Sequence, residues 1–86
     1  MHVVKKKTLQ DFWRKHRAAE TPLRAWLKDA ERAEWRSMHD IKSYARTADL
    51  VGDHRVVFNI GGNKYRLVAR IRYDYRLVNV RCVLQG

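Results

Sequence analysis

Strict alternation of apolar and basic residues over positions 64–72 constrains the fold more than any other feature of this chain. The odd positions are apolar and the even ones are basic, with a single valine as the exception. Alternate side chains of a β-strand point to opposite faces, so this segment predicts a strand with one apolar and one cationic face. Like charges crowded on a sheet are unfavourable unless a polyanion neutralises them, so RNA or DNA is the first partner to consider.

The first half of the chain has helical periodicity instead. Apolar residues at helical spacing predict a first helix from Thr8, where Thr8 and Asp11 form a plausible capping box. A second helix is predicted to begin with Thr21 as its N-cap and Pro22 at its first helical position, where proline is well tolerated. A short helical turn is expected at residues 38–44.

Four segments read as strands: a short edge strand at residues 1–4 and longer runs at 55–60, 64–72 and 75–84. Turn residues separate the longer runs at 61–63 and 73–74. The expected fold class is therefore α+β, with two N-terminal helices packed on a small antiparallel sheet.

The apolar faces must coincide across the ladders, which allows a register to be predicted. A tight turn at residues 62–63 places Leu67 opposite Phe58, and puts Asn59 beside Arg66 and Arg55 near Arg70. A tight turn at residues 73–74 gives the second ladder the pairs Leu67/Val80, Ala69/Val78, Tyr65/Cys82 and, on the basic face, Arg66/Arg81.

Two arginines facing each other across a ladder have two interpretations. Each guanidinium can hold two phosphate oxygens in a fork, so Arg66 and Arg81 could clamp a phosphate. The alternative is an ordinary solvated face, whose long side chains spread apart or pair with acids of a partner. Spacing alone leaves both readings open.

Composition narrows the class of protein. The 86 residues carry a formal net charge of +10, which concerns partners rather than fold, and the length suits one domain spanning residues 1–86. One cysteine, Cys82, allows no internal disulfide, and a reducing compartment is the default. No apolar run is long enough to span a membrane, so we expect a cytoplasmic protein.

The four histidines lack metal-ligand spacing, so no metal or other cofactor is expected. His54 is either a proton carrier near the sheet or an ordinary loop histidine.

Several segments resemble the HigB toxins of type II toxin–antitoxin systems. The resemblance runs from residue 1 to about residue 83 and includes the Val-Phe-Asn-Ile motif, the Gly-Asn-x-Tyr/Leu-Arg motif and a closing arginine, Arg81. The segments that carry it are 8–9, 12–13, 22–26, 35, 40–42, 52–60 and 62–68.

The resemblance implies a RelE-like fold and a metal-independent endoribonuclease that cuts messenger RNA, typically on the ribosome. It also implies neutralisation by a HigA-type helix-turn-helix antitoxin, and contact with operator DNA through that antitoxin. Arg66 and Arg81 match family positions and are the expected catalytic residues. Lys42 and Lys64 match lysines of family members and are expected to bind RNA. Arg70 and Arg72 are expected to bind RNA because of their charge, and Arg55 because the predicted register places it near Arg70. His54 is the last expected RNA-binding residue and stands where relatives carry asparagine.

One departure from the family pattern concerns activity. Family members continue after the last strand with a Thr-His-x-x-Tyr-Asp segment, whereas this sequence reads Cys-Val-Leu-Gln-Gly after Arg81. A C-terminally shortened toxin domain is therefore expected. General acid–base help is worth ~100- to 10,000-fold in rate, so the alternative is an impaired toxin that only binds antitoxin or RNA. A gyrase-directed, ParE-like activity is a further alternative that the HigB-like pattern disfavours.

Overall fold

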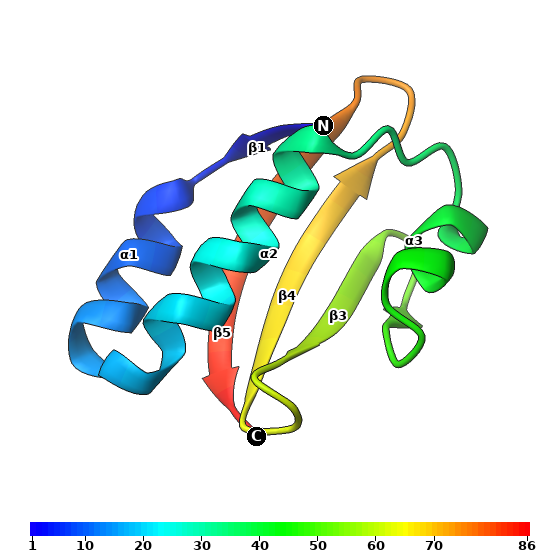
Figure 1. Cartoon of the computed structure of the whole chain (residues 1–86). Coiled ribbons are helices and arrows are strands. Elements are labelled where there is room, and N and C mark those ends of the chain that lie inside the picture. Colours follow the sequence, from blue (N-terminus) through cyan, green and yellow to red (C-terminus); the bar gives the residue numbers. More distant parts are fainter.

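The computed structural model describes residues 1–86 and has an α+β architecture, with helices on one side of a five-stranded sheet (Figure 1). The sheet order is β1-β5-β4-β3-β2. The helices are α1 (Lys6–Lys15), α2 (Glu20–Arg32) and α3 (Met38–Tyr44), with a 3₁₀ turn, η1, at Arg17–Ala19. The strands are β1 (His2–Val4), β2 (Asp49–Val51), β3 (Arg55–Ile60), β4 (Tyr65–Arg72) and β5 (Leu77–Gln85).

This architecture confirms the α+β class but corrects the expected arrangement. The sheet is mixed, because β1 pairs in parallel with β5 while the other pairs are antiparallel. The third helix, α3, joins the helical side, since its Ile41 is fully buried in the common core. The predicted edge strand at residues 1–4 and the predicted turn at 38–44 correspond to β1 and α3.

Both long helices begin earlier than predicted. Lys5 adopts a left-handed conformation (φ 62°) that turns the chain from β1 into α1, and the Thr8 backbone N–H donates to the Lys5 carbonyl. The 3₁₀ turn η1 runs directly into α2, so α2 begins at Glu20 rather than at Pro22. Pro22 still lies in the first turn of α2, where its missing N–H costs no helical hydrogen bond.

A single apolar core joins the helices to one face of the sheet. All 20 buried residues are hydrophobic and belong to one cluster, to which both the helices and β3, β4 and β5 contribute. Phe58 lies at its centre, edge-on to Trp26 and stacked near Trp35, with centroid distances of 5.4 and 5.8 Å. We call the face of the sheet under the helices the covered face and the opposite one the open face.

The register of β3 with β4 agrees with the prediction, because Phe58 pairs with Leu67 and Asn59 with Arg66. Arg55 pairs with Arg70, also as predicted. Alternation then places the apolar residues of both strands on the covered face and these polar residues on the open face.

The predicted register of β4 with β5 is wrong. The connecting turn spans residues 73–76 rather than two residues, and Arg76 closes it in a left-handed conformation (φ 53°). Ala69 therefore pairs with Val80 instead of Val78. Further along the ladder, Leu67 pairs with Val83, Val68 with Cys82, Tyr65 with Gln85 and Arg66 with Leu84.

The pairing of β4 with β5 shifts by one residue midway along the ladder, because β5 contains a bulge. Ala69 pairs with Val80 and Val68 with Cys82, which leaves Arg81 as an extra residue in β5. Bulges often redirect a side chain near functional sites. The bulge places Arg81 outside regular pairing on an exposed part of β5.

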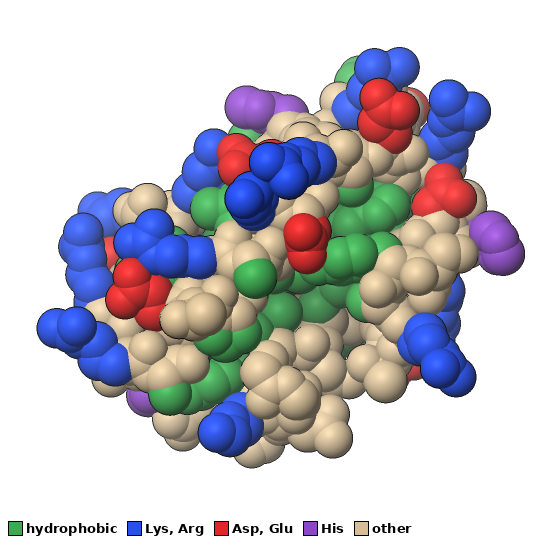
Figure 2. Space-filling model, in the orientation of Figure 1, with side chains coloured by type: hydrophobic (Ala, Val, Ile, Leu, Met, Phe, Trp, Pro, Cys, Tyr) green, Lys and Arg blue, Asp and Glu red, His purple; other side chains and the backbone are tan.

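The helical side shows a different surface from the open face. Figure 2 shows blue lysine and arginine side chains around its margins and green apolar side chains in the hollow between α2 and α3. Some of these cations pair with acids, as Lys6 does with Glu31 and Arg24 with Glu20. None of the helices is long and apolar enough to cross a membrane.

Candidate nucleic-acid interface

The open face of the sheet gathers basic side chains into one hollow. Arg55, Arg70 and Arg81 line this hollow of about 310 Å³ together with His54. They come from the start of β3, the middle of β4 and the β5 bulge. The turn at residues 51–53 forms the rest of its wall. We call this hollow, with its four basic residues, the arginine hollow.

None of the guanidinium groups of the arginine hollow forms an ion pair. None of Arg55, Arg70 and Arg81 lies within 4 Å of a carboxylate, although Asp53 also lines the hollow. All three side chains are exposed. Unpaired guanidiniums that converge on one concave surface offer several charge-assisted hydrogen bonds to phosphate oxygens.

The predicted facing pair of Arg66 and Arg81 does not occur. Arg66 lies between Asn59 and Leu84 in the sheet and lines a separate, smaller hollow of about 160 Å³. The two-residue error in the turn and the bulge at Arg81 together separate the two arginines. Arg81 instead lines the same hollow as Arg55 and Arg70.

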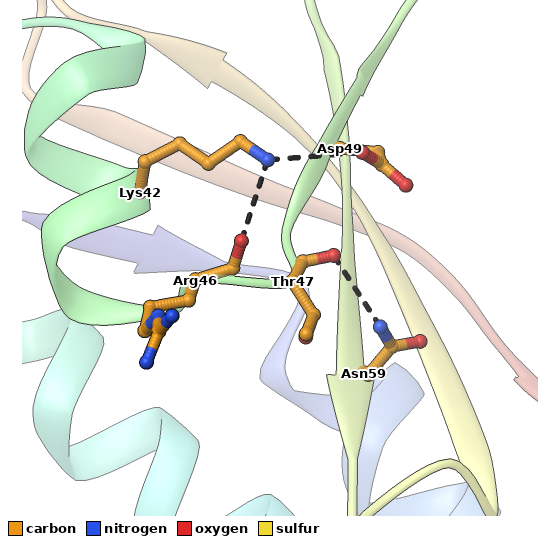
Figure 3. Close-up of polar contacts among 5 residues, drawn as sticks. All are labelled: Lys42, Arg46, Thr47, Asp49 and Asn59. Atoms are coloured by element: carbon orange, nitrogen blue, oxygen red, sulfur yellow. Dashed lines mark hydrogen bonds and ion pairs between the residues drawn. The ribbon is translucent and has the colours of Figure 1, made fainter.

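Lys42 serves a structural role at the edge of this surface. Its Nζ donates to the Arg46 carbonyl oxygen at 3.3 Å and lies 3.9 Å from an Asp49 carboxylate oxygen (Figure 3). The Asn59 amide nitrogen donates to the Thr47 carbonyl oxygen at 3.3 Å, which ties the same loop to β3. Lys42 therefore supports the loop beside the hollow of Arg66, and its ammonium is already partly engaged.

Lys64 and Arg72 lie at opposite ends of β4. Lys64 is exposed just before the strand, where its carbonyl oxygen accepts a hydrogen bond from the Gly86 N–H. Arg72 ends the strand and lines a second hollow, of about 460 Å³, which shares His54 and Arg70 with the arginine hollow. The cationic surface thus continues from Arg81 through Arg70 to Arg72, whereas Lys64 is remote from it.

Sequence reasoning missed the bulge, although the sequence contains a signal for it. Apolar residues of β5 on the covered face fall at 78, 80 and 83, so the last interval is three residues rather than two. It also gave no role to Asn79, which lies opposite Arg70 and whose buried side-chain oxygen has no hydrogen-bond partner.

The fold and the open, arginine-bearing sheet face place the chain in the class of small basic α+β domains. A family model narrows this class: the model of HigB_toxin, the RelE-like toxic component of a toxin–antitoxin system, matches residues 19–85. The chain belongs to this family and is a HigB-type toxin. Membership implies that an antitoxin is its partner. No curated protein matches the chain.

Proposed function

We propose that this toxin is a metal-independent endoribonuclease that cuts messenger RNA on the ribosome, with residues 1–86 acting as one toxin domain. The convergence of Arg55, Arg70 and Arg81 with His54 carries the proposal, because these arginines lack carboxylate partners. A phosphodiester is the ligand whose charge and oxygen geometry suit such a cluster best.

The proposed reaction needs no nucleophile from the protein. The ribose 2′-oxygen attacks the adjacent phosphorus, the bond from phosphorus to the 5′-oxygen breaks, and the products are a cyclic phosphate and a 5′-hydroxyl. Arg81, with Arg55 and Arg70, stabilises the extra negative charge on the phosphorane oxygens. His54 transfers the proton from the 2′-hydroxyl to the departing 5′-oxygen.

The other basic residues are proposed to hold RNA away from the cleaved bond. Arg66 binds a neighbouring phosphate, since it lies four residues from Arg70 along β4, which is roughly 13 Å. Arg72 extends the cationic path from the arginine hollow. Lys64 and Lys42 are proposed to contact RNA at the periphery. Lys42 should contribute less to RNA affinity than the sheet arginines, because its ammonium group already interacts with Arg46 and Asp49.

Cleavage of messenger RNA on programmed ribosomes tests this function, and cleavage of free RNA in the presence of a metal chelator tests whether the reaction is metal-independent. Loss of one transition-state donor typically costs ~100- to 1,000-fold, so Arg81→Ala should reduce cleavage by about that factor. Arg66→Ala should cause a smaller loss, and its RNA binding should depend less steeply on salt than that of wild type. Arg14→Ala, an exposed arginine on α1, is the matched control and should cleave normally. A wild-type chain that neither binds nor cleaves RNA, with or without ribosomes, would disprove the proposal.

A second candidate function is RNA or antitoxin binding without cleavage. The arginine hollow contains only two acid–base side chains, His54 and Asp53, which favours this alternative. Tight RNA binding with no cleavage by the wild-type chain would support it. Turnover that disappears in His54→Ala, while RNA binding remains, would exclude it.

The proposed partner is a HigA-type helix-turn-helix antitoxin, through which the toxin would contact operator DNA. Family membership supports an antitoxin, and the net charge of +10 favours an acidic binding surface on it. Calorimetric titration with such an antitoxin should give binding that weakens as salt rises. Absence of binding at low salt would contradict this choice of partner.

A further inference from the structure

Tyr75 is an aromatic residue that the core does not use. It lies in the turn between β4 and β5, and 68% of its surface is exposed, more than for any other large hydrophobic residue. Tyr73 in the same turn differs, because it packs against the hydrophobic core. Such an exposed ring is either an ordinary surface residue or a surface on which a partner stacks.

The ring of Tyr75 is held in place by its neighbours. The Arg72 guanidinium lies over it, 4.7 Å from the ring centroid, and an Arg72 nitrogen also lies 3.5 Å from an Asp74 carboxylate oxygen. The Tyr75 N–H donates to the Asp74 side chain at 3.1 Å, and the Arg76 N–H donates to the Tyr73 carbonyl at 3.2 Å. A ring supported in this way loses little conformational freedom when a ligand binds.

Arg72 links this ring to the arginine hollow. It lines the hollow that shares His54 and Arg70 with the one containing Arg81. A single strand of RNA whose phosphates follow Arg81, Arg70 and Arg72 would therefore arrive beside Tyr75. Aromatic rings and arginine planes are the usual supports for unpaired bases, and a cation beneath the ring strengthens the contact.

We propose that Tyr75, supported by Arg72, is a stacking site for an unpaired base of the bound RNA. The inference rests on the proposed function, since it requires RNA along the arginine hollow. Every base has a flat face, so the site should tolerate all four bases and prefer purines modestly for their larger area.

Fluorescence anisotropy with two oligomers of equal length and charge tests the proposal. One is a single-stranded RNA, and the other carries abasic-analogue nucleotides throughout. The wild-type chain should bind the RNA about 5- to 100-fold more tightly than the abasic oligomer, which is the range expected for one stacked base. Tyr75→Leu should lose most of this difference, whereas Tyr75→Phe and Tyr75→Trp should keep it.

Two comparisons distinguish stacking from effects on charge or folding. Arg72→Lys keeps the charge but loses the planar support, so it should lower affinity for the RNA more than affinity for the abasic oligomer. Tyr75→Leu should melt at the wild-type temperature, because the ring is outside the core. An RNA preference unchanged in Tyr75→Leu would overturn the stacking site alone. Binding of neither oligomer by the wild-type chain would overturn the proposed function, and the stacking site with it.

Discussion

Arg55 and Arg70 lie directly opposite each other in the ladder between β3 and β4, and neither has a carboxylate partner. Like charges in facing positions of a ladder oppose folding. The arrangement therefore lowers stability at the place where the proposed RNA phosphate would bind. Binding of the proposed phosphate between the two arginines would offset this repulsion.

Replacing Arg70 with threonine should stabilise the protein and weaken RNA binding. Removal of the facing charge should raise the free energy of unfolding by about 0.2–1 kcal/mol, as measured by chemical denaturation. Arg66→Thr is the matched control, because Arg66 faces Asn59 and Leu84 rather than a cation. An equal gain in both variants would show that the facing charge is not the cause.

Deleting Arg81 should preserve the fold and weaken RNA binding. Without the extra residue, Val80, Cys82 and Val83 can keep their observed partners in a regular ladder. We expect cooperative melting near the wild-type temperature and RNA affinity lower by about tenfold to a hundredfold, for the loss of one charged hydrogen-bonding group.

Deletion of Cys82 provides the control for this experiment. It also removes one residue from the bulge, but leaves Arg81 on the open face opposite Val68, with Val83 still on the covered face. This variant should retain most RNA binding. Equal loss of binding in both deletions would mean that the bulged backbone, rather than the Arg81 side chain, is required.

Phe58→Ala should destabilise the protein severely. The ring is 1% exposed and packs against Trp26 and Trp35. Truncation of a buried phenylalanine costs about 3–5 kcal/mol, a large part of the stability of a small domain. Denaturant unfolding should show this loss, and tryptophan emission should shift as water reaches the two indoles. A Phe58→Leu variant should lose less, and wild-type stability of Phe58→Ala would contradict the assigned core.

Tyr44 should make stability depend on pH in alkaline solution. Burial raises the pKa of Tyr44 above its ordinary value of 10.0, and the hydrogen bond and negative charge of Asp29 raise that pKa further. The folded chain thus holds this proton more tightly than the unfolded chain does. The resulting stabilisation is complete below pH 10.0 and is lost as pH rises toward the higher folded pKa.

Denaturation of wild type and Tyr44→Phe at neutral pH and just above pH 10.0 measures this effect. The free energy of unfolding of wild type should fall relative to that of Tyr44→Phe as pH increases. Asp29→Asn should show a smaller pH effect than wild type, because it removes the charge beside the hydroxyl, which lies 2.9 Å from an Asp29 carboxylate oxygen. A difference between wild type and Tyr44→Phe that is independent of pH would contradict the assigned environment.

The sequence determined which residues share a face of the sheet. Alternation along β3 and β4 is a local property, because the backbone of a strand directs neighbouring side chains to opposite sides. Together with the tight turn expected at residues 62–63, it predicted the pairing of Phe58 with Leu67 and of Arg55 with Arg70. It also placed Arg66, Arg70 and Arg72 on the open face, and the α+β class followed from the change of period along the chain.

Which arginines meet depends on packing between segments that are distant in the sequence. A strand can shift by two residues without moving any side chain to the other face, so alternation cannot distinguish a turn at 73–74 from one spanning 73–76. The bulge at Arg81 and the parallel pairing of β1 with β5 likewise depend on packing between distant segments. The sequence alone thus identified a basic face. The turn length and the bulge placed Arg81 beside Arg55 and Arg70 and away from Arg66. These two features follow from the packing of the whole core, which sets how far one strand is shifted against the next.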